Sequence, residues 1–243
     1  MKSRIGVGLA TLGVAGAMLA SGLAGVAGTA NAASKTGWVG PAGTTGYLHT
    51  STIINAPDLT AESKIYHSFG ATAAADTIGV RPRLFKSGAL CEAIDYEFNW
   101  YSSPSWTART SATCGSGWYN SHGFVAVWNA STASFNEYVT FPSDPLQWTA
   151  PPAARSASTR DVAVSDADRQ KGQNSKGQTF GPANGGQEND PALILTIGEN
   201  GKVGYVKSSE LNRKPSRGAS KAPRSIAVWD KEANRKIDTF TVG

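Results

Sequence analysis

The sequence predicts a mainly β protein: a disulfide-braced antiparallel β-sandwich or small barrel, followed by a smaller loop-rich module that ends in a β-hairpin. Three observations lead to this fold class. Several short segments alternate apolar and polar residues, turn-forming residues separate them, and two cysteines lie among them. Short strands at such spacing are typical of antiparallel sandwiches and small barrels.

The first 32 residues have the pattern of an export signal. A basic start, Met1 to Arg4, precedes an uncharged run of small apolar residues from Ile5 to Ala27, and Ala30-Asn31-Ala32 matches the A-x-A cleavage pattern. We therefore expect residues 1–32 to be a signal peptide and the protein to be secreted, with wall association as a finer alternative. No later segment is apolar enough to predict a membrane span.

Two cysteines, Cys91 and Cys114, are present in the whole chain. In an oxidising compartment this number predicts one disulfide, which would stabilise the fold by roughly 3 kcal/mol in the chain-entropy model. The pair is too small for a zinc cage and lacks C-x-x-C spacing, so we expect no metal site and no cofactor.

Composition divides the remaining chain near Trp148. Residues 33–148 hold 6 Trp, 6 Tyr and 6 Phe, with 6 basic and 8 acidic residues, whereas residues 149–243 hold four aromatic residues, with 15 basic and 10 acidic residues. A Pro/Ala/Ser-rich stretch separates the two parts. The expected organisation is an aromatic-rich all-β domain over 33–148, a linker over 149–165 and a basic, loop-rich module over 166–243.

Within the first part, residues 78–85, 94–101, 124–128 and 135–141 have the period-two pattern of strands. The second part has fewer apolar residues. Asp190-Pro191 opens the segment ALILTI, which predicts a short helix unless its β-branched residues favour a strand. Residues 202–206 predict a short strand, and residues 225–230 and 236–242 predict the closing hairpin.

Six short motifs, two in the first part of the chain and four in the second, carry a family resemblance. The segments RPRLFKSGALC and CGSGWYNSHG, together with GQTFG, PALI, GYV and FTV in the second part, resemble exported proteins of unknown function from high-GC Gram-positive bacteria. They are residues 81–91, 114–123, 177–181, 191–194, 204–206 and 240–242. The resemblance covers under half of the chain after the leader. It implies export and a disulfide, and it implies no catalytic residue.

A second, shorter resemblance covers residues 200–211, NGKVGYVKSSEL. It is similar to the closing strand and turn of bacterial SH3-like wall-binding domains. The strands that should precede such a turn are not evident from the sequence, so the resemblance implies no more than a possible wall-binding module.

Asp95 and Glu97 are the candidate catalytic residues. Two acids two positions apart on a strand point to one face, about 6.5 to 7 Å apart, which is close to the carboxyl spacing of inverting glycosidases. The alternative is that they form the solvent face of a strand whose other face carries Ile94, Tyr96, Phe98 and Trp100. The same alternation would place Cys91 on the acidic face, so either a bulge resets the register near Glu92 or the disulfide lies on the outer surface.

Other catalytic groups are poorly represented. His49, His67 and His122 have no mutual spacing that would form a local metal pair, and no G-x-S-x-G or H-E-x-x-H signature is present. The sequence therefore favours a non-enzymatic protein over an enzyme, without excluding an enzyme.

Aromatic residues around the cysteines are the candidate binding residues: Trp100, Tyr101, Trp106, Trp118 and Tyr119. Exposed rings would form a platform for sugars or peptides, whereas buried rings would be the core of a domain poor in Ile, Leu and Val. The basic run from Arg213 to Arg224 has no interleaved aromatic residues, so nucleic acid is not an expected partner. The expected partner is a cell-wall polymer or an extracellular protein.

The leading hypothesis is a secreted, non-enzymatic binding or cell-envelope-associated protein. One alternative is a secreted glycan hydrolase that uses Asp95 and Glu97. Another is an extracellular protease inhibitor that presents a loop from Ser102 to Thr113, held by the disulfide.

Overall fold

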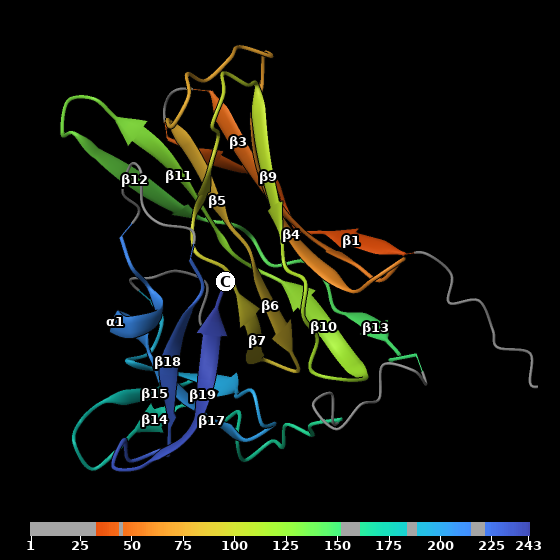
Figure 1. Cartoon of the computed structure of the whole chain (residues 1–243), viewed down its shortest axis with the longest axis vertical. Coiled ribbons are helices and arrows are strands. Elements are labelled where there is room, and N and C mark those ends of the chain that lie inside the picture. Colours follow the sequence, from red (N-terminus) through yellow and green to blue (C-terminus); the bar gives the residue numbers. More distant parts are fainter. Residues whose placement is uncertain (1–32, 44–45, 152–160, 184–188, 215–221) are drawn as a thin grey trace, which may run out of the picture. The chain divides into compact units, whose positions relative to one another are not determined.

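Strands dominate the computed structural model of the protein, and its one described helix has four residues. The structure describes residues 33–43, 46–151, 161–183, 189–214 and 222–243, so the expected signal peptide and part of the expected linker lie outside the described residues. The mainly β prediction is confirmed. Figure 1 shows the arrangement of the strands.

Two sheets form a sandwich. A five-stranded sheet runs β1-β3-β4-β9 with β2 also paired to β3, and a four-stranded sheet runs β12-β11-β5-β8. Their facing residues, including Ile65, Ile78, Val80 and Val125, form one buried cluster. The strands are β1 (Ser34–Thr36), β2 (Gly40–Ala42), β3 (Tyr47–Ile54), β4 (Thr60–His67), β9 (Ser105–Arg109), β5 (Ile78–Arg81), β8 (Glu97–Phe98), β11 (Phe124–Asn129) and β12 (Ser134–Val139).

The third sheet has ten strands, in the order β13-β10-β6-β7-β19-β18-β17-β16-β15-β14. Its strands are β6 (Arg83–Lys86), β7 (Ala89–Ala93), β10 (Gly117–Ser121), β13 (Leu146–Trp148), β14 (Gly172–Gln173), β15 (Thr179–Gly181), β16 (Leu193–Ile197), β17 (Val203–Lys207), β18 (Arg224–Trp229) and β19 (Lys236–Val242). The predicted closing hairpin is β18–β19, and the segment after Pro191 is a strand, because its β-branched residues favour a fully buried β16.

Part of this sheet closes on itself. β7 pairs in parallel with both β19 and β16, and β16 to β19 are joined by antiparallel pairs, so five strands complete a small barrel. Apolar side chains from the barrel strands form one buried cluster, which includes Leu90, Ile194, Val206, Val228 and Phe240. Strands from both compositional parts of the chain therefore share one hydrophobic core, and residues 31–243 form one compact unit.

Pro82 divides a segment that the sequence predicted as one strand. β5 ends at Arg81 and joins the sandwich, whereas β6 begins at Arg83 and joins the ten-stranded sheet. Proline has no backbone N–H to donate to a ladder, so a change of sheet at this residue loses no hydrogen bond.

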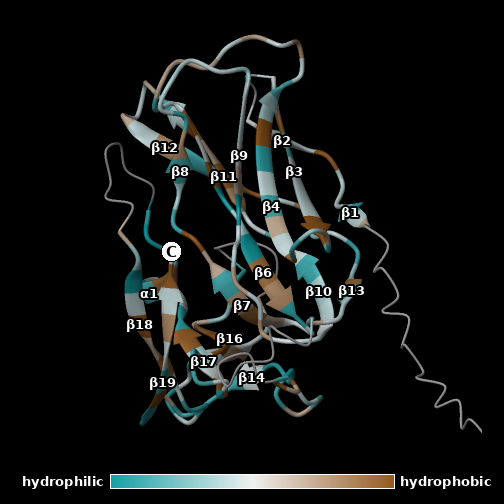
Figure 2. Cartoon of the chain, turned by 45° about the vertical axis from the view of Figure 1, so that its right-hand side comes forward, coloured by the Kyte–Doolittle hydropathy of each residue, from teal (hydrophilic) through white to brown (hydrophobic). Residues whose placement is uncertain are grey.

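Burial follows a period of two in β3 and β4. In β4 and β3 buried residues alternate with half-buried ones, and Figure 2 shows hydrophobic and hydrophilic segments along β4. These two strands were missing from the sequence prediction because polar residues, His49, Ser51 and Ser63, stand on their buried faces and weaken the apolar alternation.

Candidate functional site

The predicted disulfide is present. Cys91 and Cys114 are bonded, with a Cα–Cα distance of 5.9 Å. The register of β6 and β7 shifts between Leu84 and Phe85, so Leu84 pairs with Glu92 and Phe85 pairs with Leu90. This bulge leaves Cys91 unpaired and turns it into a buried cluster, which resolves the register conflict in favour of the bulge.

Tyr119 supports the same loop rather than a ligand. Its side chain is fully buried, its hydroxyl donates to the carbonyl of Gly115, and the backbone N–H of Cys114 donates to that hydroxyl. Trp118, its neighbour on β10, points the other way and is 54% exposed. The alternation of a strand therefore separates two of the predicted binding residues.

Asp95 and Glu97 lie in different surroundings. Both carboxylate oxygens of Asp95 accept from Arg224, at 2.8 Å from Nε and 3.1 Å from Nη2. Glu97 lines a charged depression with Glu62, Lys64 and Arg109. Arg224 comes from the far part of the chain, and no pattern in the sequence indicated this ion pair.

The strand expected over 94–101 is regular only at β8. Ile94, Tyr96 and Phe98 are buried as the alternation predicted. After Phe98 the chain leaves the sheet, and the pattern reverses: Asn99 is fully buried and Trp100 is 72% exposed. The reversal places an aromatic ring on the surface where the period-two pattern expected it in the core.

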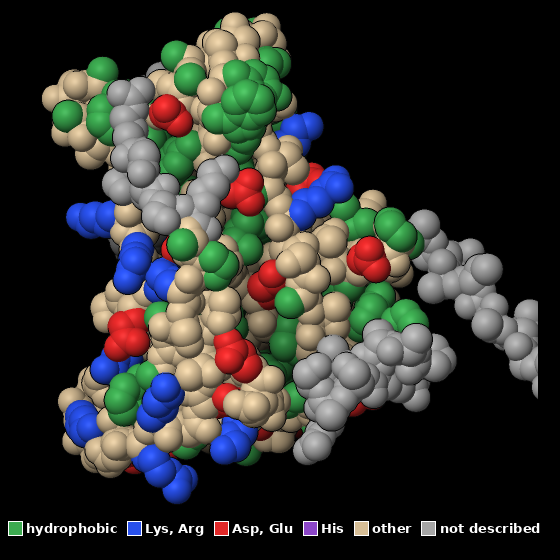
Figure 3. Space-filling model, in the orientation of Figure 1, with side chains coloured by type: hydrophobic (Ala, Val, Ile, Leu, Met, Phe, Trp, Pro, Cys, Tyr) green, Lys and Arg blue, Asp and Glu red, His purple; other side chains and the backbone are tan. Residues whose placement is uncertain are grey.

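Three of the predicted binding residues touch one another. The rings of Trp100 and Tyr101 lie 4.6 Å apart, edge to face, and those of Tyr101 and Trp106 lie 5.5 Å apart. Tyr101 is 48% exposed, and Trp106, at the start of β9, is half-buried beneath it. Figure 3 shows hydrophobic side chains gathered where β9 begins. We call Trp100, Tyr101 and Trp106 the aromatic surface.

Asn99 holds the loops that carry the aromatic surface. Its Oδ1 accepts from the backbone N–H groups of Thr77 and Ile78, at 3.1 and 2.9 Å, and its Nδ2 donates to the carbonyls of Ala74 and Tyr101, at 2.7 and 3.0 Å. All of its hydrogen-bonding capacity on both atoms is therefore used between the two loops. A bridge between Ala73 and Ser103 joins the same loops. The aromatic surface thus rests on a fixed backbone.

Phe69 extends the apolar character of this end of the sandwich. It is 88% exposed, on the turn that follows β4, and its ring packs against that of His67. The backbone N–H of His67 donates to the carbonyl of Pro104, which ties this turn to the start of β9. Nothing in the sequence pattern marked Phe69 as a surface residue.

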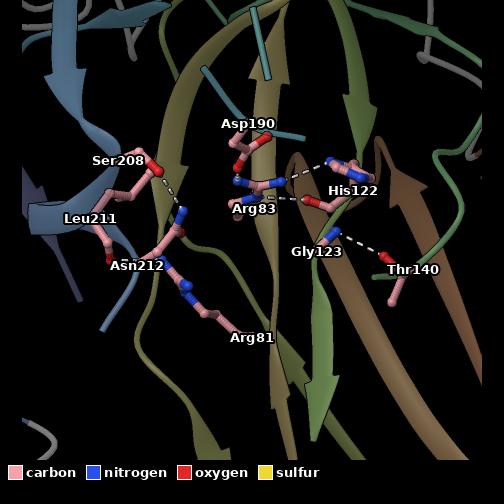
Figure 4. Close-up of polar contacts among 9 residues, drawn as sticks. All are labelled: Arg81, Arg83, His122, Gly123, Thr140, Asp190, Ser208, Leu211 and Asn212. Carbon is pink, nitrogen blue, oxygen red and sulfur yellow. Dashed lines mark hydrogen bonds and ion pairs between the residues drawn. The ribbon is translucent and has the colours of Figure 1, made fainter. Parts of the chain in front are cut away.

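A second feature is buried. Arg81 and Arg83 are both fully buried on either side of Pro82, and Figure 4 shows them among His122, Asp190 and Leu211. Arg83 Nη1 lies 2.9 Å from Asp190 Oδ2, and its Nη2 lies 3.0 Å from His122 Nδ1. Arg81 Nη2 donates to the carbonyl of Leu211 at 2.8 Å. We call Arg83, His122 and Asp190 the arginine–histidine cluster.

Burial controls the protonation of these groups. It lowers the pKa of Arg81 to about 10, a value that still leaves the guanidinium charged at neutral pH. Burial, and then the positive charge of Arg83, lower the pKa of His122 well below its ordinary value, so the imidazole is neutral. The sequence offers no local partner for His122, because its partner Arg83 comes from β6, 39 positions earlier.

Among the described residues no group of three or more His, Cys, Asp or Glu side chains is placed to hold a metal ion. None of the helices in the same ranges is long and apolar enough to cross a membrane. Comparisons with protein-family models, with curated proteins and with solved structures found no match to this chain.

Proposed function

We propose that this is an extracellular, non-enzymatic binding protein that holds a glycan of the cell envelope on the aromatic surface. The observation that carries the proposal is the exposure of Trp100 and Tyr101, in mutual contact, on loops fixed by Asn99. Large exposed rings on a rigid backbone are costly to leave in water and are typical of interaction sites. Pyranose rings present C–H faces that stack on such rings, while their hydroxyls remain solvated.

The disulfide supports the location. Disulfides persist in oxidising compartments, and Cys91–Cys114 ties the bulge of β7 against β6 to the loop before β10. An envelope location also fits the excess of basic residues in the second part of the chain, because envelope polymers of Gram-positive cells are acidic. The five-strand barrel with a short helix, α1 (Ser208–Leu211), after β17 is in keeping with the SH3-like resemblance of residues 200–211.

The alternative functions have less support. Asp95 is engaged at both oxygens by Arg224, which opposes its use as a nucleophile or base. For an inhibitor, residues from 102 to 113 should form an exposed loop, whereas Ser105–Arg109 is β9 and is paired along its length with β4. A strand held within a sheet is a poor inhibitory loop.

The test is retention on purified cell-wall material at low and high salt, with competition by soluble N-acetylglucosamine oligomers. We expect Trp100→Ala and Tyr101→Ala each to weaken retention about tenfold, a loss equivalent to roughly 1.4 kcal/mol. Trp38→Ala is the matched control, because Trp38 is 83% exposed and lies between β1 and β2. Trp118→Ala tests the third exposed ring among the predicted binding residues and is expected to behave like the control.

Two results would contradict the proposal. Absence of retention at both salt concentrations would remove wall binding altogether. Retention that disappears in high salt for the wild type and all variants alike would assign binding to charge and not to the aromatic surface.

A further inference from the structure

A pocket of about 520 Å³ lies beside the arginine–histidine cluster. Its walls are mainly apolar: Phe85 on β6, Phe141 and Pro142 after β12, and Pro182 after β15. Its polar lining residues are Asn120 and His122. The volume falls within the range of sites for small organic ligands, roughly 300 to 1,000 Å³. Apolar walls with few polar groups are the usual composition of such sites.

The contact with Arg83 fixes the tautomer of His122. A guanidinium has donors and no acceptor, so the 3.0 Å contact between Arg83 Nη2 and His122 Nδ1 requires Nδ1 to accept. A neutral imidazole that accepts at Nδ1 carries its proton on Nε2. Arg83 is itself held in place, because Nη1 bonds to Asp190 and Nε bonds to the carbonyl of His122.

His122 Nε2 has no hydrogen-bond partner within the described part of the chain. The imidazole is buried, and it packs between the rings of Phe85 and Phe124 at centroid distances of 5.8 and 6.3 Å. In Figure 4 Arg83 and Asp190 lie on one side of His122, which leaves Nε2 on the opposite edge of the ring. Buried N–H donors are rarely left unpaired, and an unpaired one costs about 1 to 3 kcal/mol.

The charge near His122 indicates which kind of acceptor would bind its Nε2–H group. Arg83 is paired with Asp190, and its positive charge still acts on the adjacent imidazole, where it adds to burial in lowering the pKa of His122. The potential at the imidazole is therefore positive, and the Arg83 contact polarises the Nε2–H bond towards a stronger donor. An anionic acceptor satisfies both the donor and the surrounding potential.

We propose that the pocket between Phe85, Phe141 and Pro182 binds a small apolar carboxylate, an aryl or alkyl carboxylic acid whose carboxylate accepts from His122 Nε2–H. The body of the ligand packs on the phenylalanine and proline walls. The same chemistry is offered by a free acid and by the C-terminal carboxylate of a peptide that ends in an aromatic residue. This site is separate from the aromatic surface and does not depend on the proposed function.

The probe is 3-phenylpropionate, compared with 3-phenylpropanol, which has the same ring and chain without the carboxylate, and with a tripeptide that ends in Phe. Binding to the full chain is followed by NMR of protein labelled with ¹⁵N at histidine, since the His122 Nε2–H signal reports the contact directly. We expect a dissociation constant of about 1 mM or tighter for 3-phenylpropionate, given its size. We expect the alcohol to bind at least about tenfold more weakly, because it brings no charge.

Two variants and one control complete the experiment. His122→Phe keeps a ring and removes the donor, and should weaken 3-phenylpropionate at least about tenfold while leaving the alcohol unchanged. Phe141→Ala, at the exposed rim of the pocket, should weaken the binding of both probes. Because Phe141 is on the surface, this variant keeps the test usable if His122→Phe does not fold. His67→Phe, at the end of β4, is the matched histidine control and should change the affinity of neither probe.

The binding results distinguish a free acid from a peptide C-terminus as the ligand. Binding of the acid and not of the peptide identifies a free acid as the ligand, and binding of both admits a chain terminus; either result supports the site. Equal affinity for acid and alcohol, or a His122 Nε2–H signal that does not move on saturation, overturns the proposal. So does absence of 3-phenylpropionate binding to protein whose histidine spectrum shows that it is folded.

Discussion

Asn99→Ala tests whether a single buried side chain holds the aromatic surface in place. The carboxamide makes four hydrogen bonds to backbone groups on two loops. The carbonyl of Ala74 also accepts from the Thr77 hydroxyl, so it keeps one partner after the substitution. Three hydrogen bonds are then lost without replacement, at about 1 kcal/mol each, and the free energy of unfolding should fall by about 3 kcal/mol.

The assay is urea-induced unfolding with the disulfide intact, monitored by tryptophan fluorescence at pH 7. Asn136→Ala is the control, because Asn136 lies exposed on β12 and its loss should be within about 0.5 kcal/mol of zero. A loss below about 1 kcal/mol for Asn99→Ala would refute the reasoning, since it would mean that water or neighbouring groups satisfy the freed backbone at little cost.

Three further predictions concern the core. Arg83→Met should cost about 3 to 5 kcal/mol because it breaks a fully buried ion pair by removing one of its two charges. A double variant with Asp190→Leu should recover part of that loss in a double-mutant cycle followed by urea unfolding, and no recovery would show that the two residues do not act together. The pKa of His122 is depressed in the folded state, so at mildly acidic pH the unfolded chain binds a proton that the folded protein does not. The free energy of unfolding should therefore fall as the pH drops below about 6.5, by up to about 1.4 kcal/mol per pH unit. His122→Phe should flatten this slope in thermal unfolding measured between pH 7 and 5. Replacing Cys91 and Cys114 together by Ala should cost roughly 3 kcal/mol by calorimetry, and an unchanged unfolding temperature would contradict a stabilising role.

The sequence predicted the local structure better than the long-range contacts. Alternation of apolar residues correctly indicated β11, β12 and the closing hairpin, because each is a local pattern against one core. It could not indicate that Pro82 transfers the chain between two sheets, or that β7 completes a barrel with strands more than 100 residues later. Both features depend on which strand edges pair after folding, and the spacing of apolar residues along the chain does not determine that pairing.

The candidate site was predicted in part. Trp100, Tyr101 and Trp106 do come together, while Tyr119 is a core residue and Trp118 lies alone on β10. Because strand alternation stops after Phe98, the exposure of Trp100 could not be derived from a period of two. The arginine–histidine cluster was invisible for a different reason: its members are separated by 39 and 107 positions.

The pairing of β7 with β19 has a consequence for the order of events during synthesis. Ala93 pairs with Val242, 149 positions later in the chain, so the barrel cannot close until β19 has been synthesised. Contacts between such distant positions form late, because the entropy of ordering the intervening chain has to be overcome first. Until then the edge of β7 that β19 covers lacks this strand, so a fragment that ends before residue 236 should not form the closed barrel.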